Sequence, residues 1–508
     1  MSFALEVDSA RDPSTTRSGN VTISHPHVDA IPELKEEPLK WTPSKAELLG
    51  SYMSIAGAAC GFISDGYQNN LMTMANVAFK KLYPSQYTSK VSTRVSNSLL
   101  VGDVLGQLFV GVLCDRVGRK AGLVFTTVLI VLGATLATAA HAVHGNVRSL
   151  FWWLTVARGI IGFGTGGEYP ASSTAASESA NESMLSNRGP VFLIVTNGVL
   201  SFGGPLAVSV FLIVLSAAGE NHLNTVWRVC FGIGIVLPMA VFYFRMRMMT
   251  PKLYRKGAIK RRVPYWLAFK RYWKTLIGTG GAWFVYDFVF FPNTVFSGTI
   301  ISTIIKTGNI KATAEWQLLL LTIALPGVWI GILLCNPLGR RNTLMLGYGG
   351  FIVFGLIIGI GYTKLLRIIP LFIVLYGLMH SLGSLGPGNL NGLVSAEAYP
   401  TPIRGTFYGL SAAIGKTGAA IGTEVFQPIR EHLGQRWTFI VAAICGILGI
   451  VITYFLVPDM TGVDLAHEDQ KFLQYLADNG WEGQIGDEDD VELVETEKAS
   501  CVEKEKSG

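Results

Sequence analysis

The sequence predicts an all-α membrane protein with twelve transmembrane helices in two pseudo-symmetric six-helix bundles. Three observations support this fold class. Of the 508 residues, 50% are hydrophobic and only 15% are charged, and the mean hydropathy is +0.40. Apolar runs of roughly 20 residues, the length that crosses a bilayer, recur along the whole chain. Two short motifs also return at nearly one spacing, which indicates an internal duplication.

The predicted spans follow one another with short connections. They cover residues 49–71, 96–114, 121–140, 150–170, 190–216, 227–244, 275–296, 317–335, 344–362, 370–394, 406–426 and 437–457. We expect a disordered N-terminal tail (1–47), a first bundle (48–244), a basic loop (245–273), a second bundle (274–457) and an acidic tail (458–508) that is solvated. No apolar core follows Met1, so no cleavable signal peptide is expected.

Basic residues set the expected orientation. The connection after the sixth span is dense in Lys and Arg between Arg245 and Lys274. Short loops rich in Lys and Arg stay in the cytoplasm. Because the number of spans is even, both termini are then expected to be cytoplasmic as well.

The fourth span contains the stretch RGIIGFGTGGEYP, from Arg158 to Pro170. Its glycines leave one helix face nearly bare, which lets a neighbouring backbone approach or lets the face wall a cavity. Glu168 and Tyr169 lie in the same apolar run, where a charged side chain is costly and usually belongs to a transport pathway. Alternatively, Glu168 is a structural partner of Arg158.

Two motifs repeat between the halves. GVLCDRVGRK after the second span is echoed by LLCNPLGRR after the eighth, with Gly118 and Gly339 separated by 221 positions. A glutamate with an Arg-Gly pair several residues later also appears twice, as Glu178 with Arg188-Gly189 and as Glu397 with Arg404-Gly405. The two glutamates are 219 positions apart. The chain is therefore expected to be a duplicated six-helix unit.

On these motifs the chain resembles the major facilitator superfamily, whose most specific signature is the GxxxDRxGRK turn. The turn is expected to join Asp115 to a helix end and to clamp the two halves in one state; a purely structural role is the alternative. The second loop has Asn336 in place of an acid, so its clamp should be weaker. We assign the following residues to gating: Asp115, Arg116, Arg119, Glu178, Arg188, Glu397 and Arg404.

Within that superfamily the chain looks like the phosphate:proton symporter group. The matches are GEYP in span four, FISDGYQ with Asp65, WFVYDFVFF with Trp283 and Asp287, LGPGNLNG in span ten, and SAAIGKTGAA with Lys416. It departs from inorganic-phosphate carriers at Phe291, where they have Tyr, and at Gly388, where they have Asn and this chain has Asn389 one position later. Losing two hydrogen-bonding side chains favours a bulkier phosphodiester, with the Phe291 ring contributing shape alone.

The variant motifs are similar to those of fungal glycerophosphoinositol and glycerophosphocholine permeases. This resemblance implies proton-coupled import of a glycerophosphodiester, a small anionic organophosphate, across the plasma membrane. The implied substrate-binding residues are Tyr169, Trp283, Asp287, Phe291, Asn389 and Lys416. The implied proton carriers are Asp65, Glu168 and Asp287, with helix capping as the alternative for Asp65. Six of these residues are expected to converge on one cavity: Asp65, Glu168, Tyr169, Trp283, Asp287 and Lys416.

Two other classes of function remain open. The chain could carry another cargo, either inorganic phosphate or an exported organic metabolite, or it could be a non-transporting sensor on a transporter scaffold. The short tails argue against a sensor. No nucleotide-binding loop, metal site or catalytic arrangement is evident, so we expect no enzyme activity, no cofactor, no metal and no nucleic-acid partner.

Overall fold

The computed structural model describes residues 45–183, 187–246, 263–305 and 309–481. The first half consists of α1 (Lys45–Leu82), α2 (Ser89–Arg116), α3 (Arg119–Thr138), α4 (Val147–Ser183), α5 (Arg188–Leu193), the π-helical turn η3 (Ile194–Gly198), α6 (Val199–Ala218) and α7 (Leu223–Met246). The single-turn 3₁₀ helices η1 (Val143–Gly145) and η4 (Glu220–His222) lie in its connections. Because α5, η3 and α6 run on without a break, this half has six long helical segments.

The second half repeats this pattern. It consists of α9 (Tyr265–Val295), α10 (Ser297–Ile305), α11 (Ile310–Leu334), α12 (Arg340–Leu365), α13 (Ile369–Gly383), the π-helical turn η5 (Ser384–Gly388), α14 (Asn389–Glu397), the 3₁₀ turn η6 (Thr401–Ile403), α15 (Arg404–His432) and α16 (Arg436–Leu456). A bend of 45° separates α9 from α10. The chain within the described ranges is therefore all-α, as predicted.

Three of the predicted spans fall on long helices that composition alone does not mark as membrane-spanning. Among the described residues, eight helical segments are long and apolar enough to cross a membrane, and the bent pair α9 and α10 makes nine. The twelve predicted spans are completed by α1, α4 and α15, which have 38, 37 and 29 residues and many small or polar side chains. These three helices lie inside the bundle, where neighbouring helices cover them.

The glycines of α4 pack against two neighbouring helices. A Cβ atom on Gly162 would lie 2.0 Å from the carbonyl oxygen of Leu99 in α2, and one on Gly166 would lie 2.2 Å from that of Asp103. On the other side, a Cβ on Gly164 would lie 2.9 Å from the carbonyl oxygen of Thr126 in α3. The glycines therefore lie on two faces of α4 rather than on the one bare face expected, and they bring three backbones together, as small residues do in membrane helices.

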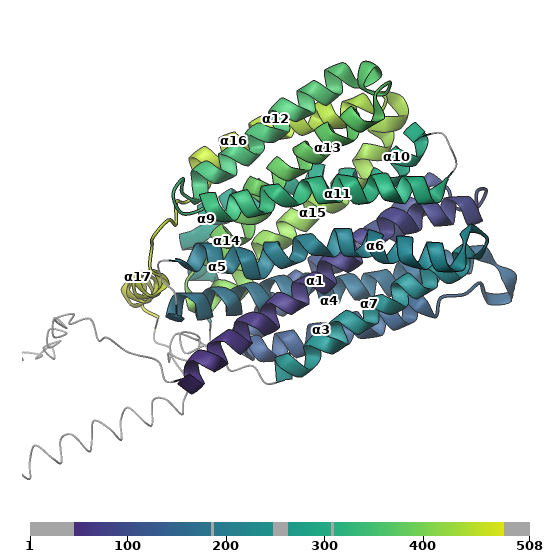
Figure 1. Cartoon of the computed structure of the whole chain (residues 1–508). Helices are drawn as coiled ribbons and strands as arrows, with labels where there is room; N and C mark the ends of the chain where they lie inside the picture. The colour runs from purple at the N-terminus through teal and green to yellow at the C-terminus, as the bar shows by residue number, and fades with distance from the viewer. Residues whose placement is uncertain (1–44, 184–186, 247–262, 306–308, 482–508) are drawn as a thin grey trace, which may run out of the picture. The chain divides into compact units, whose positions relative to one another are not determined.

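The two halves meet along two seams. Helix α2 packs along α15, and α6 packs along α11; Figure 1 shows α6 and α11 side by side. The first seam is tight because glycines lie in it: a Cβ on Gly409 would lie 2.3 Å from the carbonyl oxygen of Gln107. The seams place residues of both halves around the space between them.

Part of the predicted acidic tail is structured. Residues Leu465–Asp478 form helix α17, whose buried Phe472 contacts the ring of Tyr272 at a centroid distance of 5.9 Å. The expectation of a solvated tail is wrong for this segment, because Leu465, Phe472 and Leu476 give the helix an apolar face that it buries. The acidic run at 487–490, the tail before 45 and most of the basic loop lie outside the described residues.

Candidate functional site

A cavity lies between the two halves and is lined by both of them. Its lining combines aromatic rings, carboxamides, hydroxyls and one ion pair. The polar and aromatic lining residues are Phe62, Asn69, Asn70, Tyr169, Ser173, Phe192, Thr196, Asn197, Ser201, Trp283, Tyr286, Asp287, Phe290, Phe291, Thr294, His380, Ser384, Asn389, Tyr408 and Lys416. A cleft with few charges, shared by two halves that can move, is where a carrier binds its substrate.

The ion pair joins α15 to α9. The Nζ of Lys416 lies 3.4 Å from Oδ2 of Asp287, and both side chains are almost completely buried. Burying two charges costs solvation, which the mutual attraction offsets only in good geometry. Lysine is a point charge that suits a phosphate group. An anion that reaches the cavity therefore meets an ammonium group whose present partner is a single carboxylate at 3.4 Å.

Aromatic rings surround this ammonium group. The Nζ of Lys416 lies 3.7 Å from the ring centroid of Phe291 and 5.3 Å from that of Tyr169. A ring face attracts a cation through its negative quadrupole. The expectation that Phe291 contributes shape alone is therefore wrong, because its ring helps to hold the lysine. Trp283 extends the wall, with its ring centroid 6.3 Å from that of Tyr169.

Span ten gives a second correction. Gly388 does not open extra room, because a Cβ there would lie 2.7 Å from the hydroxyl oxygen of Tyr286. Tyr286 thus occupies the volume that a longer side chain would need. The neighbouring Asn389 lines the cavity, and its Nδ2 donates a hydrogen bond to the carbonyl oxygen of Val328, 2.8 Å away.

Asp65 lies behind the cavity rather than in its lining. Gly66, the next residue of α1, does line the cavity. Neither carboxylate oxygen of Asp65 has a hydrogen-bond partner among the described residues, although the side chain is fully buried. The charges of Glu168, Asp103, Arg245 and Lys416 all act on it. The capping alternative receives no support, because the residue lies in the middle of a continuous helix.

Glu168 also lies outside the cavity lining, and its partners are several. Its carboxylate pairs with Arg245 of α7 at 2.5 Å and accepts hydrogen bonds from Thr126 at 2.5 Å and Ser172 at 3.0 Å. The predicted convergence of all six candidates on one cavity is therefore wrong for Asp65 and Glu168. The alternative partner, Arg158, is not the one found. Arg245 was assigned to the cytoplasmic loop, but it is buried within α7.

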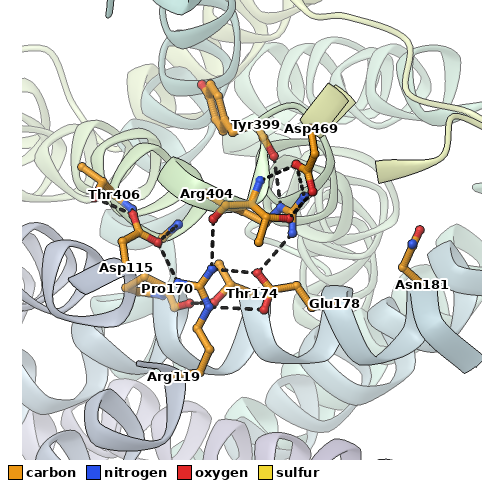
Figure 2. Close-up of polar contacts among 12 residues, drawn as sticks. Asp115, Arg119, Pro170, Thr174, Glu178, Asn181, Tyr399, Arg404, Thr406 and Asp469 are labelled. Atoms are coloured by element: carbon orange, nitrogen blue, oxygen red, sulfur yellow. Dashed lines mark hydrogen bonds and ion pairs between the residues drawn. The ribbon is translucent and has the colours of Figure 1, made fainter. Parts of the chain in front are cut away.

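Four gating candidates form a first latch, which we define as Asp115, Arg119, Glu178 and Arg404. Arg119 pairs with Asp115 at 2.7 Å and with Glu178 at 2.7 Å, and Arg404 of the other half reaches Glu178 at 3.1 Å. Figure 2 shows both guanidinium groups turned toward Glu178. Asp115 also accepts hydrogen bonds from the backbone nitrogens of Gly405, at 2.9 Å, and Thr406, at 2.6 Å. It therefore caps α15, where the helix dipole favours a negative charge.

A second latch has the same plan in the opposite halves. We define it as Asn336, Arg340, Glu397 and Arg188. Glu397 pairs with Arg340 of its own half at 3.2 Å and with Arg188 of the first half at 2.9 Å. Asn336 accepts a hydrogen bond from Arg340 at 2.6 Å. The repeated acid and Arg-Gly motifs thus exchange partners between the halves.

Arg116 is the gating candidate that lies outside both latches as defined here. Its side chain is exposed, and its guanidinium carbon lies 5.6 Å from the ring centroid of Tyr265 at the start of α9. It follows Asp115 directly, so its side chain points to another face of the helix than that carboxylate.

The segment after α16 contacts both latches. Asp469 of α17 accepts hydrogen bonds from the backbone nitrogen and the hydroxyl of Thr401, both at 2.6 Å, and lies 3.8 Å from Arg404. Burial raises the pKa of the Asp469 carboxyl above its usual value, although the charge of Arg404 opposes this shift. The carbonyl oxygen of Val463 accepts from Arg188 at 2.9 Å. Sequence reasoning missed this docking, for which the apolar spacing of Leu465, Phe472 and Leu476 was a readable signal.

Sequence reasoning also missed several polar side chains of the cavity lining, among them Asn197, Ser173 and Tyr408. Asn197 in η3 donates from Nδ2 to the carbonyl oxygen of Asn389 at 3.1 Å, so a π-helical turn of the first half contacts the second half. Tyr408 of α15 bonds to Ser173 of α4 at 2.9 Å. π-Helical turns often mark functional sites, but a single sequence does not reveal where they form.

Comparison with known proteins now fixes the family. The sequence profile described as "Sugar (and other) transporter" matches residues 51–254 and 256–472. The chain belongs to this family of major facilitator transporters. Members of this family are secondary transporters embedded in the membrane by many spans, and they are not enzymes.

Relatives and solved structures agree with this assignment. The chain is 51% identical over 448 residues to the "Glycerophosphoinositol permease 1" of Candida albicans, covering 87% of this chain and 86% of that one. It is 50% identical to the "Glycerophosphoinositol transporter 1" of Saccharomyces cerevisiae, over 89% and 88% of the two chains. The solved proton:xylose symporter XylE superposes with a TM-score of 0.70 at 14% identity, over 84% of this chain and 99% of that one, which confirms the fold.

Proposed function

We propose that this transporter imports glycerophosphodiesters together with protons across the plasma membrane by alternating access. The observation that carries the proposal is the buried pair of Lys416 and Asp287 in the wall of a cavity shared by both halves. The names of the two relatives from Candida albicans and Saccharomyces cerevisiae suggest the chemistry of the cargo, because both name glycerophosphoinositol. The latches and both termini then lie on the cytoplasmic side.

Asp287 connects proton binding to anion binding in this proposal. Its carboxylate competes with any phosphate for the ammonium group of Lys416 at 3.4 Å. Two unit charges about 4 Å apart interact by about 4 kcal/mol at the effective dielectric constant near a protein surface. A proton on Asp287 removes that competing charge and leaves Lys416 to the phosphodiester. The anion and the proton therefore favour the same state.

Asp65 is the proposed relay that brings the proton from the first half. Its two oxygens have no hydrogen-bond partner among the described residues, and the charge of Lys416 acts on it. Glu168 is proposed to fix the position of Arg245 next to that site instead of carrying protons itself. Its carboxylate is already engaged by Arg245, Thr126 and Ser172.

The test is uptake in cells that lack their own carriers of this kind. Labelled glycerophosphoinositol, glycerophosphocholine and phosphate are offered at acidic and neutral external pH. We expect uptake of a diester that is faster at acidic pH and is abolished by Lys416→Ala. In Asp287→Asn, the acceleration at acidic pH should disappear. Lys364→Ala is the matched control, because Lys364 is an exposed lysine at the end of α12.

Each other outcome removes part of the proposal. Uptake of phosphate alone would make the chain a phosphate symporter and would mean that Phe291 and Tyr286 admit a small anion. If cells accumulate none of the three compounds although the protein reaches their surface, export of an organic metabolite becomes the better hypothesis.

A further inference from the structure

The cavity has two chemically different ends. Lys416 of α15 and Asp287 of α9 form its charged end. We define the neutral end as Asn70, His380 and Asn389, which lie on α1, α13 and α14 and supply two carboxamides and one imidazole. Among the described lining residues, the only carboxylate and the only ammonium group are those of Asp287 and Lys416. A ligand that fits both ends therefore carries a negative charge at one end and a neutral polar group at the other.

Asn70 presents an acceptor at the neutral end. Its Nδ2 donates to the carbonyl oxygen of Gly66, 2.8 Å away, which fixes the orientation of the amide. Its Oδ1 is then left without a hydrogen-bond partner, although the atom is buried. The side chain packs against α6, since a Cβ on Gly204 would lie 3.2 Å from its Cγ.

Asn389 presents a second acceptor in the same way. Its Nδ2 donates to the carbonyl oxygen of Val328 in α11, so its Oδ1 is the free atom and has no partner. The residue is only 1% exposed. Two carboxamides on different halves of the protein are thus each fixed through the nitrogen and leave an oxygen unused.

His380 adds a third unused polar atom in the lining. Its Nε2 has no hydrogen-bond partner, and its side chain is 5% exposed. The rings of Phe290 and Tyr376 hold the imidazole, with centroid distances of 5.1 and 5.0 Å. Buried polar atoms are nearly always hydrogen-bonded in folded proteins. These three line the cavity together with Oδ2 of Asp287, which also has no hydrogen-bond partner but is paired with Lys416, so the three need an explanation.

We propose that these three atoms form a subsite for the neutral polyhydroxylated head group of a glycerophosphodiester, as in inositol, and that they disfavour a quaternary ammonium head group. This inference rests on the proposed function and adds the class of head group to it. A polyol supplies several hydroxyl donors to the two oxygens, and its hydroxyls donate to or accept from the imidazole. A trimethylammonium group has no hydrogen to donate and would bury the same acceptors unpaired, which is how a polar site rejects an analogue.

The aromatic residues near this end do not form a box for a cation. Tyr286 is stacked between Phe290, at 4.9 Å, and Phe351, at 5.8 Å, so both of its faces are covered. Recognition of a quaternary ammonium group needs open ring faces. In this cavity, the ring face of Phe291 is directed to Lys416.

The test compares two diesters on the same protein. Uptake efficiency for glycerophosphoinositol and glycerophosphocholine is measured for the full chain, for Asn70→Leu and for Asn389→Leu, substitutions that keep the side-chain shape and remove the acceptor. We expect each variant to lose about 10-fold or more for glycerophosphoinositol, as removal of one buried hydrogen bond does, and to change less than about 3-fold for glycerophosphocholine. Asn342→Leu is the control. Like Asn70, Asn342 donates a hydrogen bond to the carbonyl oxygen four residues earlier, but it lies outside the cavity.

A competition measurement on the unaltered protein tests the subsite even if the variants do not fold. Unlabelled glycerophosphoinositol should inhibit uptake of the labelled diester at about 10-fold lower concentration than glycerophosphocholine does. Equal competition, or an equal loss of both substrates in the variants, would overturn the subsite while leaving diester transport intact. Uptake of neither diester by the unaltered protein would instead overturn the proposed function and the subsite with it.

Discussion

The two latches are built on one plan and differ at one position. In each, an arginine after a glycine and an arginine from the opposite half share a buried glutamate. The first latch adds Asp115, whose carboxylate also caps α15 through two backbone nitrogens. The second latch has Asn336 there, and its oxygen accepts from Arg340. A charged acceptor makes stronger hydrogen bonds than a neutral one. The duplication thus conserved the crossed ion pairs while only one side gained a charged cap.

Removing the shared acid of the first latch should have the largest effect. Glu178→Gln leaves Arg119 and Arg404 buried without their common partner, and breaking such a pair costs about 3–5 kcal/mol. We expect a clear fall in the apparent melting temperature of the detergent-purified protein, with a similar fall for Glu397→Gln. Glu220→Gln serves as the control, since its pair with Lys81 is exposed and contributes little. Unchanged melting in Glu178→Gln would show that the latch does not hold the two halves.

Making the first latch resemble the second should have the next largest effect. Asp115→Asn removes the charge and replaces one of two accepting oxygens by an NH₂ group that faces other donors. The change from charged to neutral hydrogen bonds alone amounts to about 1–1.5 kcal/mol. The latched state should therefore be populated about 10-fold less relative to the open one. A larger open population should make a cysteine introduced at Ser201 in the cavity react faster with a thiol reagent that is added to the cytoplasmic face of inside-out vesicles. Slower labelling than in the parent Ser201→Cys protein would contradict the proposal that Asp115 stabilises the latched state.

The converse change, in which the second latch is made to resemble the first, should have a smaller effect on the labelling rate. Asn336→Asp places a carboxylate beside Arg340 and gives the second latch the charge that the first one has. Because Arg340 is already paired with Glu397, we expect a gain of only about 0.5–1 kcal/mol, seen as labelling about 3-fold slower at the same cysteine. Faster labelling would mean that the added carboxylate repels Glu397 more than it attracts Arg340.

Arg116→Ala should have the smallest effect. The exposed guanidinium lies over the ring of Tyr265. An exposed cation–π contact contributes about 0.5–1 kcal/mol, so labelling should change by about 2-fold. A change as large as that of Asp115→Asn would place Arg116 inside the first latch after all.

Much of this arrangement could be predicted from the sequence. Span length and motif spacing predicted the fold, and the resemblance placed Tyr169, Trp283, Asp287 and Lys416 in one cavity, as the structure does. The internal repeat also brought Glu178 and Glu397 to equivalent places.

Other features depend on contacts that no local pattern encodes. Glu168 has its partner in Arg245, 77 positions away on another helix, whereas the nearer Arg158 is directed to a backbone carbonyl of α2. Whether Gly388 opens space depended on where Tyr286 packs. A single sequence allows several partners for Glu168 and leaves the space beside Gly388 undetermined. The packing of the helices decides both.

The low hydropathy of α1, α4 and α15 has a consequence for the synthesis of this protein. A segment partitions into the bilayer according to its own apolar content, and among the described helices these three do not meet the criterion that eight others meet. They gain less from lipid contact than from their neighbours, as the glycine contacts between α4 and α2 illustrate. Insertion of α4 should therefore depend on α2 and α3 already being in place. The small residues that allow close packing around the transport cavity thus also determine the order in which these helices assemble during translation.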